Sequence, residues 1–306
     1  MIELISLFDS KINSEKTAVT VGKFDGVHKG HAYLYSIINN KKKEGFSSLV
    51  LTFSNSVREK LDSAEAGVLI TDDERKVMMS GLGIDYLVDC PFDDRMRSTS
   101  PRDFIKALCD NLSMKFMVVG SDFRFGYKGA GGTALLKELS TELGFELIVV
   151  DKIKSEDRDI SSTFVREELS KGNVEKVNEL LGYEYFVWGE VVHGAHLGHK
   201  IGIPTINITP PVNKLLPANG VYVTNCIIDG KVYGGVTNVG CKPSVKSDGR
   251  VGIETHILNF DGDLYGKEVK VVFLKFLRPE MKFASLDELK EQMNKDTECA
   301  RKYLII

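Results

Sequence analysis

The sequence predicts two successive domains of different classes: an α/β domain, followed by a small antiparallel β domain that ends in a helix. Its 306 residues exceed the roughly 100 to 200 residues of one typical domain. Short apolar runs alternate with amphipathic stretches up to residue 182, whereas residues 186–276 are rich in Val, Ile, Gly and Asn. We therefore predict a first domain over 1–182 and a second over 183–306.

Alternating strands and helices account for the first domain. The predicted strands are short apolar or β-branched runs at 18–21, 48–53, 85–88, 116–119 and 146–150. The predicted helices are amphipathic stretches at 31–43, 73–80, 101–111, 133–143 and 163–170. Ser100 before Pro101 is a typical helix start, with a serine N-cap and proline at the first helical position. Such alternation predicts a parallel sheet covered by helices on both faces.

The second domain has the pattern of an antiparallel barrel or sandwich. Asp229-Gly230 and Asp261-Gly262 each lie between strand-like segments, where hairpin turns are common. The segment from Ser285 to Tyr303 is amphipathic and predicts a C-terminal helix. Ser285 is its expected N-cap, and Glu288, three residues on, is the expected capping-box partner.

Composition and charge argue against two classes of protein, those that bind nucleic acid and those that span a membrane. Hydrophobic residues make up 42% and charged residues 27% of the chain, and the net charge of -3 provides no broad basic field for nucleic acid. No apolar stretch approaches the ~20 residues that span a bilayer, so we expect no membrane segment. The chain start lacks the features of a secretory signal. Five scattered cysteines favour reduced thiols, so we expect a cytoplasmic protein. We also expect a monomer or weak homo-oligomer.

The first candidate site is GKFDGVHKGH at 22–31, which follows the first predicted strand and opens the first helix. Its glycines allow the backbone to approach a ligand closely. A helix N-terminus favours phosphate, and His28 and His31, three residues apart, can add donors on one face. This pattern predicts a nucleotide site. The alternative is a glycine-rich turn with two surface histidines.

The His-x-Gly-His spacing resembles the signature of nucleotidylyltransferases, in which the two histidines contact the triphosphate of ATP. The longer string resembles that of the FMN adenylyltransferases. The resemblance implies that His28 and His31 are catalytic. The residues of this string that it implies for binding ATP or phosphate are Gly22, Phe24, Asp25, Gly26 and Gly30.

The segment GSDFRFGYKGAGG at 120–132 fits the same family. It follows the fourth predicted strand, and ligands of parallel sheets bind beyond the carboxyl ends of the strands. We expect its flavin-binding or phosphate-orienting residues to be Asp122, Phe123, Arg124 and Phe125. The alternative is a flexible surface loop.

The segment ISSTFVR at 160–166 resembles the Ile-Ser-Ser-Thr-x-x-Arg element of this family. The resemblance implies that Ser161, Ser162 and Thr163 bind phosphate at a helix start and that Arg166 has a catalytic role. The alternative is simple N-capping by a hydroxyl group.

The second candidate site begins in the glycine-rich segment GEVVHGAHLGHKIGIPTINI at 189–208. Backbone N–H groups of such a loop can fold over phosphates without a Walker sequence. Thr205 and Asn207 would share one face of a strand, where a hydroxyl and an amide oxygen can ligate Mg²⁺. The alternative is a hairpin with two polar residues on a solvated face, because both residue types are ordinary on strands.

This segment resembles the riboflavin kinase motif that ends in Pro-Thr-Ala-Asn, with Ile206 in place of Ala. The resemblance implies that Thr205 and Asn207 bind Mg²⁺ and ATP. It further implies that Glu254, in IETHIL at 253–258, accepts the proton of the riboflavin 5′-hydroxyl. The implied phosphate-binding glycines are Gly189, Gly194, Gly198 and Gly202.

The motifs resemble, in order from Val21 to Arg301, those of the bifunctional riboflavin kinase/FMN adenylyltransferases. The resemblance implies an α/β Rossmann-like nucleotidyltransferase domain, an antiparallel β-barrel riboflavin kinase domain and a C-terminal helix. The implied substrates and products are riboflavin, FMN, FAD and ATP, with Mg²⁺ as cofactor. One departure is Ser54-Asn55-Ser56-Val57, where the family usually has a Pro-His-Pro-like segment. Two alternatives therefore stay open: that only the kinase half is active, or that the chain is a flavin-binding regulator without turnover.

Overall fold

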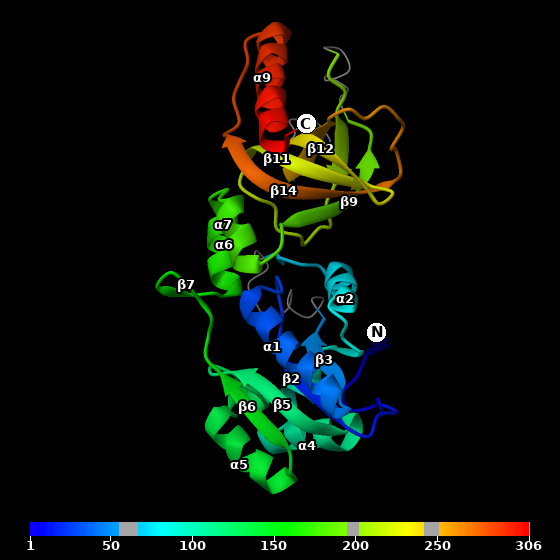
Figure 1. Ribbon diagram of the computed structural model, residues 1–306, viewed down its shortest axis with the longest axis vertical. Helices are drawn as coiled ribbons and strands as arrows, with labels where there is room; N and C mark the ends of the chain where they lie inside the picture. Colours follow the sequence, from blue (N-terminus) through cyan, green and yellow to red (C-terminus); the bar gives the residue numbers. More distant parts are fainter. Residues whose placement is uncertain (55–66, 195–201, 242–250, 306) are drawn as a thin grey trace. The chain divides into compact units, whose positions relative to one another are not determined.

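The computed structural model describes residues 1–54, 67–194, 202–241 and 251–305. The chain divides into two compact units, Met1–Ser162 and Thr163–Ile306. The first contains an open sheet and the second a closed barrel (Figure 1). Helix α7 (Val174–Leu181) and nearly all of α6 (Ser162–Ser170) fall in the second unit. The domain boundary after residue 182, placed where the sequence pattern changes, stays a prediction.

Six parallel strands form the sheet of the first unit, in the order β1-β4-β3-β2-β5-β6. Their bounds are β1 (Ile2–Leu4), β2 (Thr17–Val21), β3 (Ser47–Phe53), β4 (Tyr86–Cys90), β5 (Met114–Gly120) and β6 (Glu146–Val150). All five predicted strands occur, and the predicted parallel pairing is confirmed. The sequence did not predict β1, because three residues are too few to establish an alternating pattern.

Helices cover both faces of this sheet, as predicted. The helical elements are α1 (Lys29–Asn40), η1 (Lys41–Glu44), α2 (Asp72–Gly81), α3 (Asp94–Ser98), α4 (Pro101–Leu112), η3 (Tyr127–Gly129) and α5 (Thr133–Leu143). Val19 and Leu51 belong to the core that includes residues of α4 and α5. Ala18 and Val50 belong to the opposite core, which includes residues of α1 and α2. Neighbouring strand residues thus face opposite layers, as the two-residue period of a strand requires.

The second unit contains a closed antiparallel barrel with the strand order β10-β13-β12-β11-β14-β9. Its strands are β9 (Phe186–Val192), β10 (Ile206–Thr209), β11 (Gly220–Ile228), β12 (Lys231–Cys241), β13 (Val251–Ile257) and β14 (Glu268–Arg278). Asp229-Gly230 forms the predicted hairpin turn, with φ values of 48° and 78°. The prediction of a tight turn at Asp261-Gly262 is wrong, because this pair lies inside the longer connection between β13 and β14.

The C-terminal helix α9 (Leu286–Leu304) lies beside the barrel and contacts β11 and β12 (Figure 1). Ser285 is its N-cap, as predicted, and accepts a hydrogen bond from the backbone N–H of Glu288 at 3.2 Å. The Glu288 carboxylate accepts instead from the N–H of Ala284, one residue before the cap, so these two hydrogen bonds do not form the reciprocal pair of the predicted capping box. A short hairpin, β7 (Lys154–Ser155) and β8 (Arg158–Asp159), precedes α6.

Candidate active sites

The loop between β2 and α1 has a conformation that few sequences can adopt. Phe24, Gly26 and Val27 all have positive φ, at 48°, 83° and 40°. This region is unfavourable for a β-branched residue such as Val27, so the surrounding packing must hold the loop in place. A Cβ at Gly22 would lie 2.9 Å from the Phe24 ring, which explains the glycine there. The buried Phe24 ring therefore packs against the loop backbone at Gly22.

The two histidines lie together at the start of α1. His28 is the N-cap residue, and its ring stacks on that of His31 with centroids 3.7 Å apart. Phe24 packs edge-on against His31 at 5.1 Å. A Cβ at Gly30 would lie only 3.2 Å from the His28 ring, so glycine leaves room for it. The predicted convergence of both imidazoles at a helix N-terminus is thus present in the structure.

Both imidazoles are held in the neutral form. Burial lowers the pKa of His28 to about 4, although the nearby Asp25 carboxylate opposes this shift. Burial, and then the neighbouring His28, holds the pKa of His31 well below its usual value. The Nδ1 atoms of both rings are buried and have no hydrogen-bond partner within the described part of the chain. Each neutral ring carries one N–H, so the pair can supply two donors to an anion.

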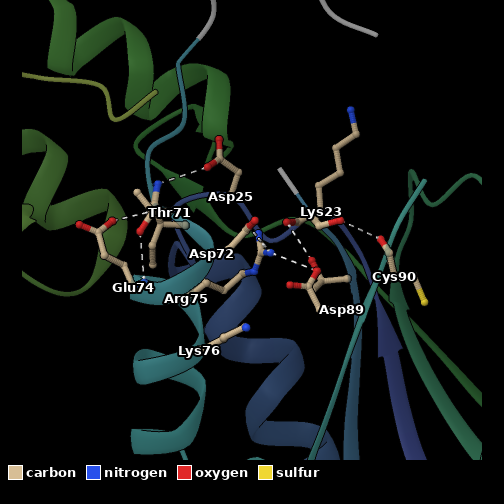
Figure 2. Close-up of polar contacts among 12 residues, drawn as sticks. Lys23, Asp25, Thr71, Asp72, Glu74, Arg75, Lys76, Asp89 and Cys90 are labelled. Atoms are coloured by element: carbon tan, nitrogen blue, oxygen red, sulfur yellow. Dashed lines mark hydrogen bonds and ion pairs between the residues drawn. The ribbon is translucent and has the colours of Figure 1, made fainter. Parts of the chain in front are cut away.

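Asp25 braces the histidine loop against the segment that leads into α2 (Figure 2). Its carboxylate accepts hydrogen bonds from the backbone N–H groups of Leu69 at 3.0 Å and Ile70 at 3.4 Å. Thr71 and Glu74 then form a reciprocal capping box at the start of α2. These contacts of the Asp25 side chain fix the loop that carries His28, and the predicted binding of ATP or phosphate by Asp25 stays a prediction.

The start of α2 is in turn held to the sheet by a fully buried arginine (Figure 2). Arg75 donates from Nη2 to Asp72 at 2.6 Å and to Asp89, at the end of β4, at 3.5 Å. Burial raises the pKa of Asp89, whereas the Arg75 charge acts to lower it. This polar cluster, with the capping box, fixes the backbone that Asp25 contacts.

The ISST element approaches the same loop through Ser162, whose hydroxyl donates to the Asp25 carbonyl at 2.8 Å. Ser161 directly precedes α6, and Thr163 and Arg166 lie on it. The last two residues belong to the second compact unit. Phosphate binding by Ser161, Ser162 and Thr163, and the catalytic role of Arg166, stay predictions.

A cavity of about 350 Å³, here called the aromatic cavity, opens beside Gly22. Its lining includes Phe123, Arg124 and Phe125 from the predicted flavin segment, and the two phenylalanine rings stack at 5.4 Å. Asp122 is not among the lining residues and forms an ion pair with Lys152 at 2.8 Å. The other aromatic residues of the lining, which the sequence motifs did not indicate, are Phe53, Phe92 and Phe104.

In the second unit, the predicted base and a predicted metal ligand form a hydrogen bond. The Thr205 hydroxyl donates to Oε1 of Glu254 at 2.6 Å. Asn207, the other predicted ligand, is buried and stands opposite Glu254 in the pairing of β10 with β13. These three residues, up to 49 positions apart in the chain, therefore meet at one place on the barrel.

Two cavities flank the pair of Thr205 and Glu254. The helix-side cavity, of about 170 Å³, is bounded by the barrel and by α9, and both residues line it. The loop-side cavity, of about 480 Å³, is bounded by residues 204–206 and by the connection after β13, and Thr205 lines it as well. Thr205 thus lines both cavities, an arrangement that suits a reaction between two bound substrates.

An ion pair fastens α9 to the helix-side cavity. Arg278, at the end of β14, donates from Nε to Oδ1 of Asp296 at 3.0 Å and from Nη2 to Oδ2 at 2.7 Å. Gln292 also donates to Asp296, at 2.9 Å. Both members of the ion pair line the cavity, and neither was identified from the sequence.

The four predicted phosphate-binding glycines have different surroundings. A Cβ at Gly194 would clash with the side-chain amide of Asn207, so glycine at this position leaves the predicted ligand in place. A Cβ at Gly189 would meet the Thr209 carbonyl at 2.4 Å, a requirement of strand packing. Gly202 has a φ of 77°, and Gly198 lies outside the described residues.

The described residues contain no group of three or more His, Cys, Asp or Glu side chains arranged to hold a metal ion. None of the helices in the described part of the chain is long and apolar enough to cross a membrane.

Comparison with known proteins gives matches over nearly the whole chain. The FAD synthetase family matches residues 10–164, and the riboflavin kinase family matches residues 181–304. The bifunctional riboflavin kinase/FMN adenylyltransferase of Escherichia coli is 35% identical over 298 residues, covering 96% of this chain and 95% of that protein. The protein of the same name from Pseudomonas fluorescens is 34% identical over 284 residues, covering 92% and 91%.

A solved structure also matches both units. A crystal structure described as a macrolide-efflux protein from Streptococcus pneumoniae is 30% identical, covers 98% of each chain and has a TM-score of 0.88. The architecture is therefore shared along the whole length, whatever that name says of its own function. With two family matches in sequence and relatives of one name over more than nine-tenths of its length, the chain belongs to the bifunctional riboflavin kinase/FMN adenylyltransferase family.

Proposed function

We propose that this chain phosphorylates riboflavin to FMN in its second unit and transfers AMP from ATP to FMN in its first unit, forming FAD. Family membership supports both activities. The observation that carries the placement of the kinase reaction is the hydrogen bond between Thr205 and Glu254, between two cavities. A carboxylate and a hydroxyl so placed provide a base and a metal ligand for phosphoryl transfer.

In the kinase reaction, riboflavin occupies the helix-side cavity and ATP the loop-side cavity. Glu254 uses Oε2 to accept the proton of the 5′-hydroxyl, because Oε1 already accepts from Thr205. The hydroxyl oxygen bonds to the γ-phosphorus, the bond from that phosphorus to the bridging oxygen breaks, and ADP leaves. The family motif supports phosphate contacts by Gly189, Gly194 and Gly202, and by Gly198, which lies outside the described residues.

Thr205 and Asn207 fit a magnesium ion by the chemistry of their donors. The Thr205 hydroxyl gives its only hydrogen to Glu254, so its oxygen lone pairs are left for a cation. An amide oxygen of Asn207 would be the second protein ligand, and Mg²⁺ prefers such hard oxygens. When bound, the ion would offset the negative charge of the phosphates and of ADP as it leaves.

In the adenylyl transfer, the FMN ring binds in the aromatic cavity, against Phe123 and the other phenylalanines of its lining. An FMN phosphate oxygen bonds to the α-phosphorus of ATP, and the bond to pyrophosphate breaks. The N–H groups of His28 and His31 donate to the phosphate oxygens on which charge develops. The phosphate-binding roles of Ser161, Ser162, Thr163 and Arg166 are supported by the resemblance of their motif to the family element.

The first experiment follows flavins over time in a mixture of the protein, riboflavin, ATP and Mg²⁺. FMN followed by FAD is the expected result. FMN alone would favour the alternative with an active kinase half only, and tight flavin binding without ATP consumption would favour a regulator.

Glu254→Gln tests the kinase assignment. The substitution keeps the size of the side chain and removes the base, so FMN formation should fall by about 100-fold or more. Supplied FMN should still become FAD at the wild-type rate. Glu268→Gln, at an exposed position of β14, is the matched control. Unchanged FMN formation in Glu254→Gln would refute the assignment.

We also place the protein in the cytoplasm, as a monomer or weak homo-oligomer. Cys90, Cys109, Cys226 and Cys299 are free thiols, which suits a reducing compartment. Light scattering across a dilution series measures the assembly state, and a stable oligomer at low concentration would contradict this expectation.

A further inference from the structure

The backbone pairing of β10 with β13 ends immediately beside the kinase site. Ile206 pairs with Thr255 and is the first residue of β10. Pro204 lies two residues before it and has no N–H to donate to a neighbouring strand. The sheet therefore provides no regular ladder for the backbone that leads into Thr205.

A side chain continues the pairing where the backbone stops. His256, the next residue of β13, lies with its Nδ1 atom 2.8 Å from the carbonyl oxygen of Pro204. A carbonyl oxygen can only accept, so Nδ1 must carry the hydrogen and donate it. The imidazole thus takes the place of a missing ladder bond.

This hydrogen bond acts on the orientation of Thr205. The carbonyl of Pro204 and the nitrogen of Thr205 belong to one planar peptide unit, so fixing the direction of the oxygen fixes the plane from which Thr205 projects. The side-chain hydroxyl of Thr205 in turn donates to Oε1 of Glu254 at 2.6 Å. Glu254 and His256 are two residues apart on β13 and so face the same way. Two residues of β13 therefore fix Thr205: Glu254 accepts from its hydroxyl, and His256 donates to the carbonyl that precedes it.

The same bond joins the walls of the two cavities. His256 lines the helix-side cavity with Glu254, whereas Pro204 lines the loop-side cavity with Thr205. A change in the distance between these walls changes the distance between the two substrates. Phosphoryl transfer depends strongly on such positioning.

We propose that His256 is a positioning residue for phosphoryl transfer, which holds the Pro204 carbonyl and thereby sets Thr205 against Glu254. This inference rests on the proposed kinase chemistry at that pair. In this role the ring moves no proton and needs no charge. Its contribution is the single Nδ1–H donor, at a defined place.

Three substitutions separate this donor from the ring. In His256→Asn, the amide nitrogen lies close to the position of Nδ1, so the bond to Pro204 can be kept. In His256→Gln, the amide is one bond farther from the backbone, and in His256→Ala it is absent. We expect His256→Gln and His256→Ala to lower kcat for FMN formation by about 10- to 100-fold, the usual cost of losing a group that orients a ligand. His256→Asn should stay close to the wild-type kcat.

The same preparations provide the controls. FAD formation from supplied FMN, assayed in each variant, should be unchanged, and the wild-type protein must phosphorylate riboflavin in parallel. Failure of the wild type would refute the proposed kinase function itself. With an active wild type, a normal kcat in His256→Ala would refute the positioning role. An equal loss in all three variants would also refute it, because the ring and not its Nδ1 donor would then be required.

Discussion

Replacing His31 with alanine tests whether two neutral, stacked imidazoles stabilise the adenylyl transfer. The pKa of His28 is about 4 and that of His31 also lies well below its usual value, so at pH 7 each ring offers an N–H without a positive charge. One such donor to a developing oxyanion is typically worth about 3 to 4 kcal/mol, or several hundredfold in rate. His31→Ala should therefore lower FAD formation from FMN by several hundredfold.

The structure also predicts the behaviour of the matched variants. His31→Ala removes the ring that stacks on His28 at 3.7 Å, so part of its loss comes from a less ordered His28. His31→Gln keeps an amide donor and should lose less activity. Tyr33→Ala, at an exposed position of the same helix, should change little. The assay is FAD formation from FMN and ATP, with FMN formation from riboflavin measured on the same protein. An equal loss of both activities in His31→Ala would refute two separate sites.

Two further predictions concern an ion pair and a buried histidine. Asp296→Asn removes the negative charge that accepts from Arg278 at 3.0 and 2.7 Å in the lining of the proposed riboflavin cavity. It should raise the KM for riboflavin about tenfold and leave kcat unchanged. The control Glu291→Gln, which removes an exposed ion pair with Lys295, should change neither constant. A loss of kcat alone would contradict this. The pKa of His28 falls from 6.5 to about 4 on folding, so between these pH values the unfolded chain binds more protons than the folded chain. The contribution of His28 to the free energy of unfolding is therefore fully present above pH 6.5 and is lost as the pH falls toward 4. Denaturant unfolding measured across this pH range should show that the free energy of unfolding falls by up to about 3 kcal/mol, and His28→Asn should reduce that fall. Identical pH profiles of stability in the wild type and in His28→Asn would contradict the lowered pKa of His28.

The sequence predicted the order of elements well because each strand and helix is encoded locally. The alternation of Ala18 and Val19 between two cores follows from the two-residue period alone. Local signals failed where length or context decides. β1 is three residues long, and Asp261-Gly262 has the composition of a tight turn but lies in a longer connection. The fold class and the family predicted from the motifs are both confirmed.

The candidate sites were predictable only where their residues share a motif. His28 is the N-cap and His31 the third residue of α1, two positions whose side chains lie close together at a helix start, so their spacing predicted neighbouring rings. The aromatic cavity instead combines Phe53, Phe92 and Phe104, which come from separate elements and meet only through the sheet. A signal was available for the first two, because each lies at or just after the carboxyl end of a strand, where ligands of parallel sheets bind. The binding roles of all these residues stay predictions.

The two proposed sites differ in a way that follows from the chemistry of their nucleophiles. A riboflavin hydroxyl must lose a proton to attack phosphorus, so the proposed kinase site needs a base. Glu254, with Oε1 accepting from the Thr205 hydroxyl, is the group proposed for this role. FMN attacks with a phosphate oxygen that is already an anion, so the first unit needs no base. There, groups that remain uncharged near neutral pH are sufficient, provided that they donate toward the oxygens on which charge develops. Burial of His28 and His31 achieves this, because it keeps both rings neutral and spares their close stack the repulsion of two positive charges.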